Sequence, residues 1–331
     1  MKTVIVLGTW SSGSGAVSDY LSSRKEFYNP FGVNEFKIIS DPMGLHYLFK
    51  NCYFQKDLLN PSHVFEEYKK YISNIQSYPV FSSYGKKKLL YDKSINTLTN
   101  KFLNDITLIK YYGLPHYKSL SLDFDKKLFL KFRRKLSSKS IPDLKVLPII
   151  TPVNSNKFIK KAREYILNII KTSSKVKIKN KIILLNNGAD ICDPLTSSQY
   201  YYNPKIICVT RDPRDIYCGM KSRQAGSTPW YDVKIFVKWY KYYFGNKDFK
   251  KKLKNKSILS IKFENFINNF EQENRKICKF LNINEKVEFD KKNKKIFDIN
   301  ISKKNIYKSK KLISKKDFNF IESSLKEYLQ W

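Results

Sequence analysis

Several features that mark common protein classes are scarce in this sequence of 331 residues. No apolar run approaches the roughly 18 residues that a membrane-spanning helix needs, and the opening run, residues 4–7, is too short for a signal peptide. The five cysteines lack CxxC spacing, so we expect them to be reduced and mostly structural. We therefore expect a cytoplasmic protein with no transmembrane segment and no metal site.

Acidic residues are also scarce. There are 29 of them against 63 Lys and Arg, a formal net charge of +34. Such a charge is typical of proteins with polyanionic partners, although many of these lysines could equally be solvated surface residues. Because no nucleic-acid motif is recognisable, a nucleic-acid partner is not expected. Peripheral contact with an anionic membrane stays open.

Short apolar runs alternate with helical patterns along the chain. The runs predict strands at 3–7, 36–39, 146–150, 181–185, 205–210 and 257–263. Helices are predicted after residue 13, along 155–170, from Pro229, and up to about residue 282. This alternation indicates an α/β fold, one domain over residues 1–331 with a central parallel sheet flanked by helices.

Two segments depart from that alternation. Residues 51–140 are rich in Tyr, Phe and Lys and are predicted to form an inserted, mainly helical region beside an acceptor substrate. Residues 291–316 are densely basic and poor in apolar side chains. We predict a basic lid or loop there, with a solvated surface as the alternative.

The segment VIVLGTWSSGSGAVSDYL, residues 4–21, has the mechanics of an anion cradle. Gly8 and Gly13 stand five apart as in GxxxxGK[ST], but Ser14 and Gly15 replace the Lys and Ser/Thr, which argues against an NTP-dependent kinase. A strand, a glycine-rich turn and a helix N-terminus would aim amide groups at an anion. The residues expected to hold it are Ser11, Ser12, Gly13, Ser14, Gly15 and Ala16. A turn without a ligand is the alternative.

A second candidate site follows the predicted strand at 205–210. Arg211 comes directly after it, in KIICVTRDPRDIYCGMKS, with Pro213 and Asp215 beginning a predicted helix. The ends of parallel strands are where open α/β sheets bind ligands, and the planar guanidinium suits a phosphate. An Arg–Asp surface network around a helix N-terminus is the alternative.

These segments together resemble the sulfotransferases that use PAPS (3′-phosphoadenosine 5′-phosphosulfate). Residues 8–15 match the frame of the family's phosphosulfate motif, G-x-P-[KR]-S-G-T-[TS], and Arg211, Pro213 and Asp215 match its 3′-phosphate motif, R-x-P-x-D-x-x-x-S. Residues 258–283 resemble its later segment, in which acidic residues follow a strand and lead into a helix, and the three blocks keep the family's order. The resemblance implies a P-loop-like sulfotransferase fold, PAPS as donor, PAP (3′-phosphoadenosine 5′-phosphate) as product, and no required metal.

The sequence departs from this family at two motif positions. Ser11 stands where the family has Lys or Arg, and Gly219 stands where the second motif has Ser. The resemblance makes Ser222 a substitute for that serine. It also makes Lys303 and Lys308 candidate ligands of the 3′-phosphate, because the family has a basic loop in that part of the chain.

The resemblance further suggests a carboxylate as general base. Glu35 lies 24 residues after Ser11, as in the glutamate-base members of the family, with Lys37 predicted on the same side to steady the sulfuryl charge. A strand from Phe36 would fix this glutamate beside the donor. His46 is the competing base. Lys37 could instead be an ordinary ion-pair partner.

The expected activity is transfer of a sulfuryl group from PAPS to a hydroxyl of a carbohydrate or a related acceptor. It would proceed by in-line displacement, with catalysis mainly by positioning and electrostatics. Two alternatives stay open: a protein of this fold that binds PAPS or PAP without catalysis, and a basic nucleic-acid-binding protein.

Overall fold

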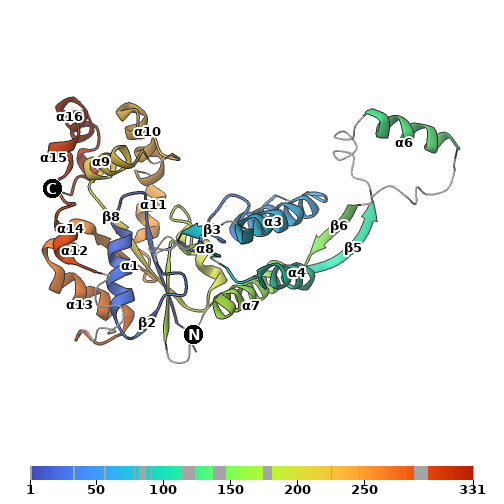
Figure 1. The fold of residues 1–331 in the computed structure, drawn as a ribbon, viewed down its shortest axis with the longest axis horizontal. Helices are drawn as coiled ribbons and strands as arrows, with labels where there is room; N and C mark the ends of the chain where they lie inside the picture. Colours follow the sequence, from blue (N-terminus) through green and yellow to red (C-terminus); the bar gives the residue numbers. More distant parts are fainter. Residues whose placement is uncertain are drawn as a thin grey trace.

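The computed structural model describes most of the chain. The described residues are 2–32, 34–55, 57–77, 79–81, 87–89, 91–113, 124–136, 147–173, 181–224, 226–245, 247–286 and 297–330. Figure 1 shows two parts, a layered α/β body and an arm that extends away from it.

A five-stranded sheet forms the centre of the body, with strand order β2-β7-β1-β8-β9. Its strands are β1 (Thr3–Gly8), β2 (Phe27–Tyr28), β7 (Ile182–Asn186), β8 (Pro204–Thr210) and β9 (Ile258–Lys262). Every neighbouring pair is parallel. The predicted α/β class with a central parallel sheet is therefore confirmed, and so are the strands predicted at 3–7, 181–185, 205–210 and 257–263.

Alternate residues of β1 face two separate hydrophobic cores. Val4 and Val6 pack against α1 (Ser14–Ser23), α12 (Phe263–Asn268) and α13 (Phe270–Leu281). Ile5 and Leu7 face the larger core. Because both faces are covered, the sheet strands read as continuous apolar runs in the sequence rather than as alternating ones.

Four helices pack over the second face and carry the larger core outward. They are α2 (Leu45–Tyr53), α3 (Asn60–Ser77), α4 (Ile95–Asp105) and α7 (Ser155–Ser173). Aromatic rings join them: the Phe102 and Tyr165 rings stack with centroids 4.6 Å apart, and Phe158 lies edge-on to Phe102. The side chain of Asn154 caps α7 by accepting a hydrogen bond from the Lys157 amide at 2.9 Å. Helices from the middle of the chain thus continue the core of the sheet.

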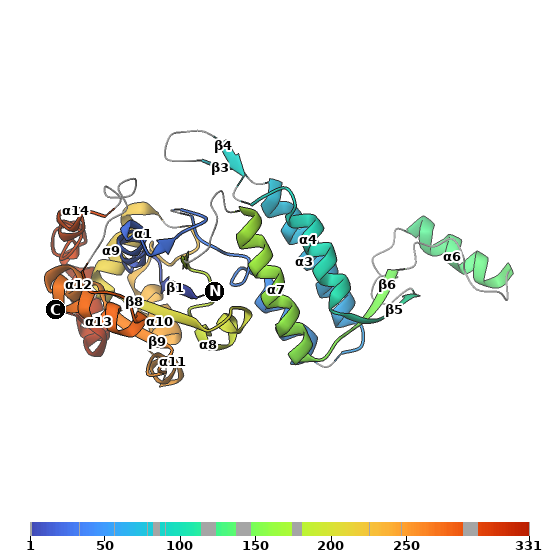
Figure 2. The same ribbon diagram turned by 90° about the horizontal axis from the view of Figure 1, so that it is seen from below.

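The arm continues beyond α3, α4 and α7 (Figures 1 and 2). It consists of an antiparallel ribbon, β5 (Thr107–Gly113) with β6 (Leu147–Pro152), and helix α6 (Phe124–Leu136). The strand predicted at 146–150 thus exists, but it joins this ribbon and not the central sheet. A second small ribbon pairs β3 (Pro79–Phe81) with β4 (Lys87–Leu89). The region 51–140 is mainly helical among its described residues, with these short strands added.

The C-terminal half adds a series of short helices to the body. They are α8 (Pro194–Ser197), α9 (Pro213–Arg223), α10 (Val233–Phe244), α11 (Lys247–Leu253), α14 (Ile299–Lys303), α15 (Ser309–Leu312) and α16 (Lys315–Ser324). A third core joins α9, α10 and α16. Among the described residues, no helix has both the length and the apolar character needed to cross a bilayer.

Two local predictions were wrong. Lys37–Ser40 form a turn, not a strand, because the amides of Ser40 and Asp41 bond back to the Lys37 carbonyl at 3.0 Å. Helix α10 begins at Val233 and not at Pro229, because the Asp232 carboxylate caps it by accepting two backbone N–H bonds.

We predict that Phe158→Ala lowers the free energy of unfolding by about 3–5 kcal/mol, since a fully buried ring is removed from the junction of the helices and the body. Urea denaturation with a helix-sensitive signal measures this. Leu58→Ala is the control, because that side chain is 89% exposed and its loss should change stability by less than about 0.5 kcal/mol. Equal effects of the two changes would contradict the packing described here.

Candidate functional site

The loop between β1 and α1 is built around two glycines. A Cβ at Gly8 would lie 2.1 Å from the Oγ of Ser12. Gly13 has a left-handed φ of 88°, and a Cβ there would lie 2.2 Å from the Phe263 ring. Glycine is therefore required at both positions, by contact with neighbours and, at Gly13, also by backbone conformation.

The same loop leaves polar groups available to an anion. Ser14 and Gly15 occupy the first two positions of α1, where amides have no acceptor within a helix. Ser12 is buried, and its hydroxyl has no hydrogen-bond partner among the described residues. A Cβ at Gly15 would meet nothing within 4 Å, so the space in front of the helix is open. One predicted donor is already used: the Ala16 amide donates to the Gly13 carbonyl at 3.0 Å, which closes the first turn.

Arg211 lies beside this loop at the carboxyl end of β8, the neighbour of β1 in the sheet. Its guanidinium donates to the Ser11 carbonyl at 2.8 Å and to the Asn305 carbonyl, and it lies 5.0 Å from the centre of the Phe263 ring. The side chain is buried, and its Nε has no partner among the described residues. Burial lowers the pKa of Arg211, and the nearby charge of Asp215 acts against that shift. Two of its five N–H donors therefore join the loop to the C-terminal segment, and further N–H groups stay available to a ligand.

Asp215 fixes that C-terminal segment to α9. Its carboxylate accepts hydrogen bonds from the backbone amides of Tyr307 and Ser309 at 2.9 Å each and from the Ser309 hydroxyl at 2.7 Å. An ion pair of 3.7 Å links it to Arg211. The predicted basic loop is thus held against the second motif over residues 305–309.

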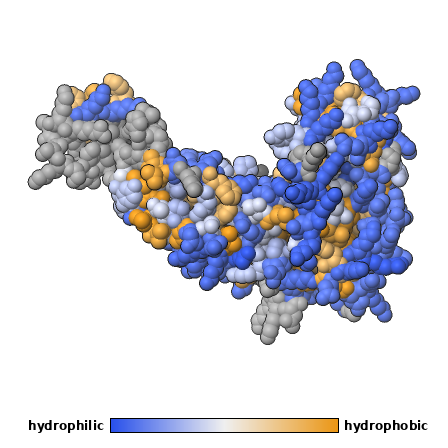
Figure 3. Space-filling model, turned by 180° about the vertical axis from the view of Figure 1, so that it is seen from behind, coloured by the Kyte–Doolittle hydropathy of each residue, from blue (hydrophilic) through white to orange (hydrophobic). Residues whose placement is uncertain are grey.

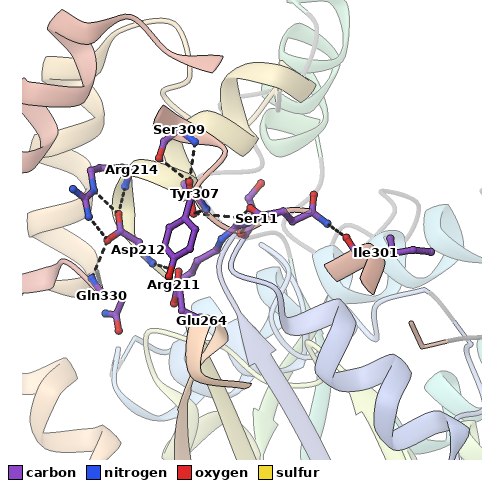
Figure 4. A network of polar contacts seen from close by, with 11 residues as sticks. Ser11, Arg211, Asp212, Arg214, Glu264, Ile301, Tyr307, Ser309 and Gln330 are labelled. Atoms are coloured by element: carbon purple, nitrogen blue, oxygen red, sulfur yellow. Dashed lines mark hydrogen bonds and ion pairs between the residues drawn. The ribbon is translucent and has the colours of Figure 1, made fainter. Parts of the chain in front are cut away.

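The sequence analysis did not identify a second buried pair in the same motif. Asp212 caps α9 and binds the Arg214 guanidinium through both carboxylate oxygens at 3.0 Å each (Figure 4). It also accepts the Gln330 amide at 2.8 Å, and its own amide donates to Glu264 at 3.0 Å. Burial raises the pKa of Glu264. The spacing Asp212–x–Arg214 was the available signal, and it indicates a structural role.

The two departures from the family motifs touch one another. Ser11 has a left-handed φ of 61°, and its Oγ lies 2.6 Å from where a Cβ of Gly219 would be. A serine at position 219 would therefore collide with Ser11 as it stands. Because Gly219 on α9 has no side chain, there is room for the Ser11 side chain of the loop. The residue allowed at position 219 therefore depends on the residue at position 11.

Glu35 is held at the cavity by two partners. Lys37 Nζ lies 2.8 Å from one carboxylate oxygen, and Asn187 Nδ2 donates to the other at 2.5 Å. Asn187 follows β7 in a left-handed conformation and accepts the Gly8 amide at 3.2 Å through its side chain. The sequence analysis missed Asn187, whose signal was its place just after a buried strand. The Asn187 side chain links Glu35 to the glycine loop. This contact, and not the strand predicted from Phe36, positions the glutamate.

His46 occupies a different position. It is buried on α2, with Nδ1 3.1 Å from the Tyr200 hydroxyl and Nε2 3.3 Å from the Asp193 carboxylate. It does not line the cavity described next. The competing base is therefore packed into the protein interior.

A cavity of about 960 Å³ brings most of the predicted residues together. Those lining it are Ser11, Ser12, Gly13, Ser14, Gly15, Ala16, Glu35, Lys37, Arg211, Ser222 and Lys308. Lys303 is exposed and does not line it, and neither does any described residue of 51–140. Side chains not anticipated are Trp10, Asp41, Asn186, Asp190, Arg223, Trp239 and Tyr243. Three segments distant in the sequence thus share one cavity.

Cysteine and metal chemistry have little support in the described part of the chain. All five cysteines are free thiols, as predicted. Burial raises the pKa of Cys208 to about 12 and that of Cys192 to about 11, so both are poor nucleophiles. No group of three or more His, Cys, Asp and Glu side chains suited to a metal ion occurs among the described residues.

Comparisons with known proteins point in one direction. Residues 198–286 match the model of a family described as the sulfotransferase family. This segment contains Arg211, Asp215 and the whole of the later block, 258–283, so the resemblance to sulfotransferases is confirmed over these two blocks. A search of curated proteins finds no match.

Three similar solved structures are sulfotransferases or sulfotransferase domains. The domain from the Synechococcus PCC 7002 olefin synthase is 12% identical at a TM-score of 0.43, with 98% of this chain and 94% of that chain covered. The domain from the curacin biosynthetic pathway is 14% identical at 0.39, covering 98% and 97%. A sulfotransferase from Mycobacterium avium is 8% identical at 0.32, covering 88% and 98%.

We predict that Gly219→Ala destabilises the protein by about 1–3 kcal/mol, because the new Cβ meets the Ser11 side chain. Adding Ser11→Gly should restore most of that loss, so thermal melting of the two single variants and the double variant should give non-additive changes. Gly15→Ala is the control, since its Cβ has open space and should cause no loss. Additive effects would show that positions 11 and 219 are independent.

Proposed function

We propose that this chain, a member of the sulfotransferase family by its residues 198–286, transfers a sulfuryl group from PAPS to an acceptor hydroxyl. One observation carries the proposal. The glycine loop, Arg211 and Glu35 come from three separate segments, yet all line one cavity at the carboxyl edge of the sheet. That edge is where open α/β sheets bind ligands.

The residues present fit a donor with two anionic ends. The first is the loop, where the Ser12 hydroxyl and the first amides of α1 lack partners, and where no lysine is required because the donor has no γ-phosphate. The second is the region of Arg211 and Lys308, two cations that line the same cavity. We assign the 5′-phosphosulfate to the loop and the 3′-phosphate to this second region.

The chemistry at the acceptor is assigned to Glu35. PAPS, when bound, supplies the sulfuryl group, and PAP is released as the sulfur–oxygen bond to its phosphate breaks. The Glu35 carboxylate accepts the proton of the acceptor hydroxyl while that oxygen bonds to sulfur. Asn187 and Lys37 hold the carboxylate in place, and Lys37 also lies where it can stabilise negative charge on the sulfuryl oxygens.

The acceptor is proposed to be a carbohydrate or another molecule with several hydroxyls. Three further polar side chains line the cavity that contains Glu35: Asp41, Asn186 and Asp190. The side-chain oxygen of Asn186 is buried and has no partner among the described residues, so it is available to a hydroxyl donor. These polar groups could hydrogen-bond to the hydroxyls of such an acceptor.

A second candidate function is PAP or PAPS binding without catalysis. It is favoured by Ser11, which brings a hydroxyl and no charge to the position where the family has a cation. It is also favoured by the Arg211 guanidinium, which already binds two backbone carbonyls. Donor binding in the absence of turnover with any acceptor would favour this function.

We predict that PAP raises the melting temperature far more than ATP with Mg²⁺ does, because the loop lacks the residues that grip a γ-phosphate and the metal. At a hundredfold excess over Kd, the stabilisation should be about 2.7 kcal/mol. Lys308→Gln should weaken PAP binding by about tenfold or more, since a charge-assisted contact is lost. Lys303→Gln is the matched control outside the cavity and should bind normally. Equal stabilisation by ATP with Mg²⁺ would refute the assigned donor.

We predict that Glu35→Gln lowers turnover by about 10²–10⁴-fold, because an amide cannot accept the proton. PAP affinity and melting temperature should barely change, since the ion pair lost to Lys37 is partly exposed and contributes less than about 1 kcal/mol. Transfer of label from sulfur-labelled PAPS into glycan and small-molecule fractions measures turnover. Glu271→Gln, at an exposed position on α13, is the control. Normal turnover in Glu35→Gln with loss in His46→Asn would move the base to His46.

A further inference from the structure

We propose that the arm is a membrane-surface anchor that binds anionic phospholipid bilayers. We define the arm as β5, β6 and α6, which project beyond the helices packed on the body and lie opposite α15 and α16 (Figures 1 and 2). None of its described residues lines the cavity. The proposal is therefore independent of the sulfotransferase function.

The arm concentrates exposed apolar side chains. Of the twenty large apolar residues that are exposed among those described, eight lie in the arm. They are Leu108, Ile109, Tyr111, Tyr112, Phe124, Leu128, Phe129 and Phe132. In Figure 3 orange patches lie where the arm begins and among its coloured atoms, and the body is mostly blue with further orange patches. Apolar surface gathered in this way on one projection is typical of an interaction site.

Helix α6 has the pattern of a helix that lies in a membrane interface. Phe124, Leu128 and Phe132 follow one another at four-residue spacing, which puts them on one face, and they are 79%, 44% and 59% exposed. The helix segment contains six basic residues and one acidic residue. Exposed Lys127 and Lys131 belong to the same helix. Apolar and basic residues combined on one exposed helix are typical of peripheral membrane binding.

The ribbon extends the same surface. Every side chain from Leu108 to Tyr112 is exposed, on both faces of the strand. Tyr111 and Tyr112 are amphipathic, and Lys110 Nζ lies 5.4 Å from the centre of the Tyr112 ring. Tyrosines of this kind favour the headgroup region of a bilayer, and the lysine adds attraction to anionic lipid.

Charge complementarity favours an anionic bilayer over a second copy of this chain as the partner of the arm. A second copy of this chain would also carry a formal charge of +34 and would bring another basic arm, which opposes self-association through this surface. An anionic bilayer satisfies the apolar and the basic residues at once. The interaction also needs no groove, because the apolar residues of α6 are exposed on the helix surface.

The test is sedimentation of the full-length protein with vesicles of phosphatidylcholine containing about one-third phosphatidylserine, and with phosphatidylcholine alone. We expect binding to the anionic vesicles that is lost at about 0.5 M salt, because the charges are screened there. The double variant Phe124→Ala/Phe132→Ala should bind about tenfold or more weakly. Lys110→Gln/Lys131→Gln should lose about fivefold per lysine.

Matched controls separate the arm from the overall charge. Leu58→Ala/Tyr231→Ala removes exposed apolar side chains elsewhere, and Lys238→Gln/Lys241→Gln removes two exposed lysines of α10. Both controls should bind as the parent does. The proposal is overturned if arm and control variants bind equally. It is also overturned if the phenylalanine variants change only the oligomeric state in light scattering, since the surface would then contact a second copy.

Discussion

The buried ion pair between Arg211 and Asp215 joins the separate parts of the site. Arg211 donates to the glycine loop and to residue 305, while Asp215 accepts two amides and a hydroxyl from residues 307 and 309. Because both charged groups are buried, each needs the other and its backbone partners to offset the cost of leaving water. Three stretches of chain are thereby fixed at one edge of the sheet.

The contacts of Arg211 also determine how a phosphate could bind to its guanidinium. Two backbone carbonyls use two of the five N–H donors of the Arg211 guanidinium. A phosphate that displaced one of these carbonyls would release the C-terminal segment from the loop, although Asp215 would still hold residues 307 and 309. Such a displacement would couple ligand binding to the position of Lys308 through contacts on α9 and α15.

Much of the secondary structure of the body was predictable, because the sequence patterns that indicate it lie within short stretches of chain. The apolar runs at 3–7 and 205–210 gave β1 and β8, and the glycine spacing gave the loop between β1 and α1. The strand at 146–150 was also predicted, but its partner was not, since pairing depends on residues far away in the sequence. Phe36 was misassigned for a similar reason: one amide bond to the end of β7 holds it, and the following residues turn.

The site residues that were missed share a physical property. Asn187, Asp212 and Arg214 act through side-chain contacts with residues distant in the sequence, such as Glu35 and Gln330. No periodicity marks such contacts. The paired departures at Ser11 and Gly219 are similar, since each looks like a defect in its own motif. Their mutual fit becomes visible only when the loop and α9 lie side by side.

The topology of the sheet also sets the order of events on the ribosome. β1 pairs only with β7 and β8, so Thr3 must wait for residues 183 and 204 before it has neighbours. At about 5–20 residues per second, this delay lasts roughly 10–40 s, during which an apolar strand has no partner. The intervening helices α3, α4 and α7 lie within one continuous stretch of chain and pack on one another. They can therefore fold first and offer a surface on which the first strand is later enclosed.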